Sequence, residues 1–146
     1  MNKNLLGQLL VGILLCLHTA CLSVDVDDAA GDWVIYNWST STTNPGIVNT
    51  AKIRIDPVEN TAFLVEVPPN DWGYEVDDVV FSDLSGFRGE LVGMTTLRYL
   101  PLNPITPQPV TLRLLSQRSI IEVLWTNPNT QEEELMMTML RLDLKL

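Results

Sequence analysis

Apolar and polar residues alternate one by one through much of the chain, and this pattern restricts the fold more than any other feature. The clearest run is at the C-terminus, where charged residues separate Leu140, Leu142, Leu144 and Leu146. Neighbouring side chains on a strand point to opposite faces, so such a run buries one face and exposes the other. No segment has a comparable helical period, although residues 24–30 could form one short turn. The pattern predicts an all-β fold.

Clusters of Pro, Gly, Asn and Asp separate the alternating runs. These residues fix or permit turn dihedrals, or bond to their own backbone. The cluster Asp83-Leu84-Ser85-Gly86, for example, predicts a turn between the fourth and fifth strands. The eight predicted strands are 33–38, 47–55, 61–67, 73–81, 87–99, 110–115, 119–126 and 133–145. Residues 100–109 contain four prolines, which lack a ladder donor, so we expect a long rim loop or a bulged edge there.

Short connections between successive strands favour antiparallel pairing and an up-and-down eight-stranded barrel, because closure removes exposed edges. A two-sheet β-sandwich is the alternative. An eight-stranded barrel is either filled by side chains or holds one small ligand, and the sequence leaves both open. We expect most space along the fifth predicted strand, which contains Gly89, Gly93, Thr95 and Thr96.

Residues 1–20 are typical of a signal peptide. Lys3 supplies the positive start, Leu5–Leu17 form the apolar stretch, and the small residues Thr19 and Ala20 follow. The stretch has 13 residues, fewer than the roughly 20 that a membrane-spanning helix needs. We therefore expect an exported protein without a transmembrane helix after cleavage.

Cys21 would be the one cysteine left after cleavage, because Cys16 lies within the signal. An intramolecular disulfide is then excluded. The five residues that end at Cys21 resemble the cleavage box of bacterial lipoproteins, which implies that Cys21 carries acyl chains such as palmitate. Cleavage nearby without a lipid, giving a secreted or periplasmic soluble protein, is the alternative. Leu22 in place of an aspartate resembles the sorting pattern for the outer membrane.

The chain thus divides into a signal peptide (1–20), a lipidated cysteine with a short acidic tether (21–30) and a barrel domain (31–146). From Cys21 onward it carries eighteen acidic and eight basic side chains. This charge repels nucleic acid, so we expect no nucleic-acid partner. We expect the protein to be held at the membrane by the lipid anchor.

Catalytic chemistry has few candidates in the mature chain. The sole histidine, His18, lies in the signal, which excludes histidine-based triads and the usual zinc sites. Asp77 and Asp78 would point to opposite faces of a regular strand, and Glu132–Glu134 suit a solvated turn, where a weak calcium site is a remote alternative. We predict no enzyme activity, no cofactor and no metal.

Gly31-Asp32-Trp33 stands at the entrance to the first strand and resembles the Gly-x-Trp signature of lipocalins and related barrels. The resemblance implies that Gly31 permits a tight entry and that Trp33 packs across the closed end of the barrel. It also implies a basic side chain over that Trp, for which Arg141 is the candidate. All three would be structural residues.

Aromatic residues supply the candidate contacts for a ligand or partner. They are Trp38, Trp72, Tyr74 and Tyr99, among others that core packing explains. Trp72 stands out because the surrounding Pro-Pro-Asn-Asp-Trp-Gly sequence places it in a loop.

Two functions follow from these observations. The first is a membrane-anchored, lipocalin-like protein that binds a small apolar or amphipathic ligand inside its barrel. The alternative is an accessory lipoprotein with a plugged barrel that contacts another protein of the cell envelope.

Overall fold

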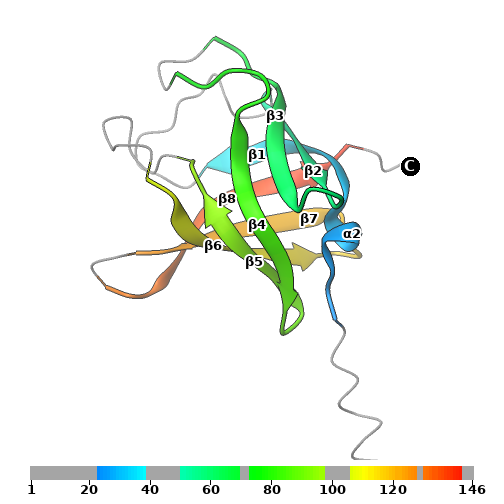
Figure 1. The fold of residues 1–146 in the computed structure, drawn as a ribbon, viewed down its shortest axis with the longest axis vertical. Helices are drawn as coiled ribbons and strands as arrows, with labels where there is room; N and C mark the ends of the chain where they lie inside the picture. Colours follow the sequence, from blue (N-terminus) through cyan, green and yellow to red (C-terminus); the bar gives the residue numbers. More distant parts are fainter. Residues whose placement is uncertain (1–22, 39–49, 70–72, 98–105, 128–129, 143–146) are drawn as a thin grey trace, which may run out of the picture.

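The chain forms one closed barrel of eight antiparallel strands in chain order, with β8 paired to β1 (Figure 1). The structure is a computed structural model that describes residues 23–38, 50–69, 73–97, 106–127 and 130–142. A short helix, α2, precedes the first strand. The elements are α2 (Val26–Ala29), β1 (Gly31–Trp38), β2 (Lys52–Asp56), β3 (Thr61–Glu66), β4 (Val79–Phe87), β5 (Glu90–Thr95), β6 (Gln108–Leu115), β7 (Ile120–Thr126) and β8 (Glu133–Arg141).

The barrel confirms the all-β, up-and-down eight-stranded fold expected from the alternation and excludes the two-sheet sandwich. Five strands overlap their predicted ranges closely: β1, β3, β6, β7 and β8. The strand β2 covers only the second half of its predicted range, 47–55. The predicted rim loop over residues 100–109 falls largely outside the described residues. Within those residues, no helix has the length and hydropathy needed to cross a membrane.

The hairpin of β4 and β5 corrects the sequence prediction. The strand predicted at 73–81 and the turn predicted at Asp83–Gly86 are wrong, because β4 begins at Val79 and continues through that cluster to Phe87. The strand predicted at 87–99 contains β5. Asp83, at φ 54°, lies in a bulge where one extra residue of β4 interrupts the register with β5. The turn is instead Arg88-Gly89, whose φ values of 52° and 85° suit a two-residue hairpin loop.

The centre of the barrel is filled by large apolar side chains, and every strand contributes. These side chains are at most 2% exposed: Trp33, Ile35, Ile53, Ile55, Leu64, Phe81, Leu91, Leu112, Ile121, Val123, Met137 and Met139. A central cavity large enough for a ligand would leave accessible surface on the side chains around it. Their burial therefore indicates a packed core.

At Gly93 and Thr95 the space expected along the fifth strand is filled, which corrects that part of the prediction. Thr95 is buried, and its hydroxyl donates to the Val80 carbonyl at 2.9 Å. A Cβ added to Gly93 would lie 2.6 Å from the Ser82 carbonyl oxygen, so the neighbouring strand already occupies that position. Gly89 lies in the hairpin turn, and Thr96 follows the end of β5.

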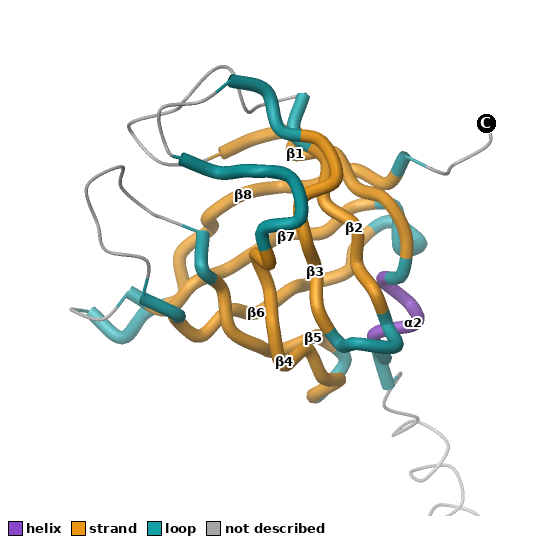
Figure 2. Tube along the Cα trace, turned by 45° about the horizontal axis from the view of Figure 1, so that its top comes forward, coloured by secondary structure: helices purple, strands orange, loops and turns teal. Residues whose placement is uncertain are grey.

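The two ends of the barrel differ in their connections. At one end, which we call the turn end, the strands are joined by residues 57–60, 88–89 and 116–119. At the other end, the loop end, the connections are residues 39–51, 67–78, 96–107 and 127–132. The short helix α2 packs against the barrel near the turn end, where it contacts β2 and β4 (Figure 2).

Residues 24–30, which we call the N-terminal strap, pack against the turn end. Asp25 begins α2 with a capping box, and Val26 and Ala29 bury their side chains in the core. A Cβ on Gly86 of β4 would lie 2.0 Å from the Val24 carbonyl oxygen, so only glycine permits this close approach. The segment expected to form an acidic tether is therefore docked from Val24 onward.

The three residues of the Gly-x-Trp resemblance also meet at the turn end. Gly31 begins β1 at φ 121°, a region that favours glycine. Trp33 is fully buried, and its indole N–H donates to the Ala29 carbonyl at 2.8 Å. The Arg141 guanidinium carbon lies 5.0 Å from the centroid of the Trp33 ring, and the Nη2–H of the same guanidinium donates to the Ala30 carbonyl. Together these contacts join the strap to β1 and β8.

Candidate functional site

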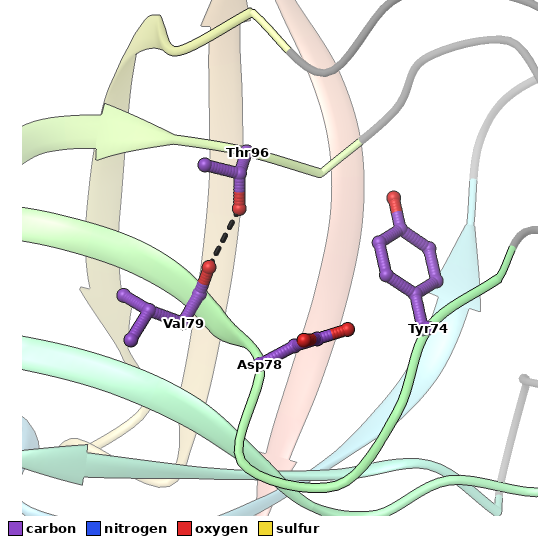
Figure 3. A pocket seen from close by; sticks show the side chains of 4 residues that line it. All are labelled: Tyr74, Asp78, Val79 and Thr96. Carbon is purple, nitrogen blue, oxygen red and sulfur yellow. Dashed lines mark hydrogen bonds between the residues drawn. The ribbon is translucent and has the colours of Figure 1, made fainter.

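A cavity of about 160 Å³ lies at the loop end, beside the start of β4 and the end of β5. Tyr74, Asp78, Val79 and Thr96 line it (Figure 3). Val79 is the first residue of β4, and Thr96 follows the last residue of β5. The Thr96 hydroxyl donates to the Val79 carbonyl at 2.6 Å, so the two strand ends form one wall.

The opposite wall comes from the connection that precedes β4. The backbone N–H of Glu75 donates to Asp78 Oδ2 at 2.8 Å. The turn is also paired with β3, because the Leu64 N–H donates to the Asp78 carbonyl at 3.0 Å and the Leu64 carbonyl accepts from the Asp77 N–H at 2.8 Å. Asp77 and Asp78 thus lie in a tight turn rather than on the predicted strand, which corrects that expectation. The turn holds the Asp78 side chain in place.

The cavity combines one carboxylate, one aromatic ring, an aliphatic side chain and a hydroxyl. The Asp78 side chain extends towards Tyr74 (Figure 3), and among the described residues its Oδ1 accepts no hydrogen bond. Tyr74 is only 9% exposed, and Val79 is 46% exposed. The volume is about half the lower limit of ordinary ligand pockets, roughly 300 Å³. The site therefore suits a single functional group rather than a whole ligand.

The structure places the sequence candidates in different environments. Tyr74 lines the cavity, and Trp38 is buried in the core at the end of β1. Trp72, Tyr99 and Cys21 lie outside the described residues. The sequence did not point to Asp78, Val79 or Thr96 as a group, because they come from two strand ends and a turn with no shared motif.

Several charged side chains elsewhere on the described barrel form ion pairs on its outer wall. Arg54 bonds to Asp32 at 2.6 Å, and this hydrogen bond lowers the pKa of the Asp32 carboxyl below its ordinary value. Arg113 bonds to Glu90 at 2.6 Å, which raises the pKa of the guanidinium further. In the described part of the chain, no three metal-ligating side chains gather into one cluster. These pairs stabilise strand neighbours and leave the cavity as the candidate site.

No protein-family model, no curated protein and no solved structure matches the chain.

Proposed function

We propose that this protein is an exported, lipid-anchored accessory protein of the cell envelope. In this proposal the protein is not an enzyme, Cys21 carries the acyl chains, and the residues at the loop end contact another envelope protein. The outer membrane is the proposed location.

The packed centre of the barrel carries the proposal. All eight strands contribute side chains that are almost fully buried, from Trp33 on β1 to Met139 on β8. A barrel that encloses a ligand needs interior volume, and these side chains fill the interior. We therefore do not propose a ligand enclosed at the centre, and we assign the function to the outer surface.

The arrangement of the two ends supports an anchored contact protein. The described chain begins at Ser23 and meets the barrel beside Gly86, at the turn end. A lipid on Cys21 would be attached two residues before Ser23, so the turn end would face the membrane. The longer connections and the cavity would then face away from it. Loops on a rigid scaffold are the usual place for binding residues.

A lipocalin-like origin of the barrel belongs to the same proposal. It is supported by Gly31 at the entrance to β1, by Trp33 across the turn end and by Arg141 above the Trp33 ring.

Site-specific photo-crosslinking in the native cell tests the contact. A photoreactive residue is placed at Val76 near the cavity, with Val58 at the turn end as the matched position; both valines are exposed. We expect position 76 to give a discrete adduct with an envelope protein, absent at position 58. Equal adducts at both positions, or none at position 76, would overturn the proposed contact.

Metabolic labelling with a fatty-acid analogue tests the anchor separately. We expect labelling of the wild-type chain and none of Cys21→Ser. Equal labelling of the two would refute lipidation at this cysteine.

A further inference from the structure

The segment that supplies Tyr74, Asp78 and Val79 carries a one-sided charge, although its Asp56 and Glu59 lie at the turn end and Arg98 follows Thr96 by two residues. Between Arg54 and Arg88 the chain has no lysine or arginine, although it contains eight acidic residues. Three of these, Glu75, Asp77 and Asp78, lie in the turn that forms one wall of the cavity. Like charges this close together favour a positively charged group, which relieves their mutual repulsion.

The free carboxylate oxygen favours an ammonium group over a guanidinium. Asp78 Oδ2 already accepts the Glu75 N–H, and Oδ1 accepts no hydrogen bond from the described residues. A guanidinium binds best to both oxygens of a carboxylate at once. An ammonium is a compact charge with three donors, so it can bond to one oxygen and place a second donor near the Thr96 hydroxyl oxygen.

The remaining walls suit the carbon chain that carries an ammonium. Tyr74 is nearly buried and therefore fixed, and an aromatic ring attracts a cation. Val79 offers an exposed aliphatic surface for methylene groups. A volume of about 160 Å³ excludes a drug-sized molecule, since ordinary pockets begin at roughly 300 Å³, but leaves room for the end of one side chain.

We infer that this cavity binds the ammonium group of a lysine side chain presented by the protein partner. The inference rests on the proposed contact at the loop end. A protein source is favoured over a lipid headgroup because the cavity lies at the end of the barrel opposite the N-terminal strap.

A peptide titration tests the inference. The isotope-labelled mature chain is titrated with acetyl-Gly-Lys-Gly-amide at low ionic strength, and with the same peptide acetylated on the lysine amine. We expect saturable NMR shifts of the Val79 and Thr96 amides with the lysine peptide only. Equal shifts with the acetylated peptide, or no shifts with either, would overturn the inference.

Two charge-removing variants give a matched comparison. Asp78→Asn removes the charge but keeps an oxygen that can accept the Glu75 N–H, so the turn should remain folded. Asp77→Asn removes the same charge one residue away, and asparagine tolerates the φ of 71° at that position. We expect Asp78→Asn to weaken peptide binding about fivefold and Asp77→Asn to weaken it less than twofold. Equal weakening would show a diffuse charge effect and overturn the site.

The titration tests the ammonium site, and the crosslinking tests the contact with a partner, so either proposal can be refuted without the other. Loss of the crosslink at position 76 with a normal titration would remove the partner and leave an ammonium site. A crosslink without peptide binding would support the contact with a partner and refute the binding of a lysine in the cavity.

Discussion

The turn end and the loop end of this barrel are built differently, although the same eight strands run through both. At the turn end, connections of four residues or fewer join the strands, and the N-terminal strap covers the core. At the loop end, the connections have 13, 12, 12 and six residues, and a small cavity lies between two of them.

We interpret this difference as a division between stability, at the turn end, and the proposed protein contact, at the loop end. The turn end is fixed by local backbone geometry and by contacts of Trp33 that reach residues far apart in the chain. The loop end has the cavity, and Val76 and Val79 beside it are exposed. Substitutions at the turn end should therefore change the free energy of unfolding, and substitutions at the loop end should change binding.

The largest effect is expected at Trp33. This side chain is fully buried, and its N–H bonds to Ala29. We expect Trp33→Ala to reduce the free energy of unfolding by about 3–5 kcal/mol, measured by urea denaturation. Val79→Ala at the loop end is the matched control, with an expected change within about 0.5 kcal/mol. A similar loss from both variants would contradict the division between the ends.

A substitution at Gly86 tests how closely the N-terminal strap packs against β4. An alanine Cβ at this position would collide with the Val24 carbonyl, so β4 or the strap must shift. We expect Gly86→Ala to cost about 1–3 kcal/mol and to speed amide hydrogen exchange in residues 24–30. The neighbouring Ser85→Ala should leave both quantities near wild type. Unchanged exchange in the strap of Gly86→Ala would show that the close approach is not needed.

Substitutions of Arg141 and Arg54 compare a contact with a buried ring and a salt bridge on the surface. Arg141 stacks on Trp33 and donates to Ala30, whereas Arg54 pairs with Asp32 on the outer wall. We expect Arg141→Met to cost about 1–2 kcal/mol and Arg54→Met less than about 1 kcal/mol. Calorimetric unfolding of both variants gives the comparison. The reverse order would mean that Arg141 contributes little to the turn end.

The smallest effect is the acid response of Asp32. Its folded-state pKa lies below the ordinary value of 3.8 because Arg54 bonds to the carboxylate. The pair therefore stabilises the fold above that pH, and this stabilisation is lost as the pH falls through the lower folded-state pKa. We expect Asp32→Asn to lose a few tenths of a kcal/mol near neutral pH and to match the wild type in strong acid. A difference that stays constant with pH would exclude the ionised pair as its cause.

The regular part of the barrel follows from sequence, because one buried face repeats at every second residue. Runs such as Ile53 to Ile55 and Ile121 to Val123 match their strands closely. The β4–β5 hairpin does not, because Asp83-Leu84-Ser85-Gly86 has turn chemistry but forms a bulge and a close contact with Val24. A long-range contact of this kind leaves no local signal.

The candidate site was foreseen only in part. Tyr74 is one of the four aromatic candidates from the sequence, but its neighbours Asp78 and Thr96 come together only through pairing of the turn with β3 and of β4 with β5. The sequence also left open whether the barrel is hollow. That question depends on how the side chains of eight strands fill a shared volume, which alternation alone does not specify.

Native mass spectrometry of the protein purified from its own cell tests the central claim, a packed barrel that acts through its surface. The account predicts the mass of the mature chain with its acyl chains and no enclosed small molecule at any activation energy. A stoichiometric small molecule that survives purification and is released only at high activation energy would contradict it.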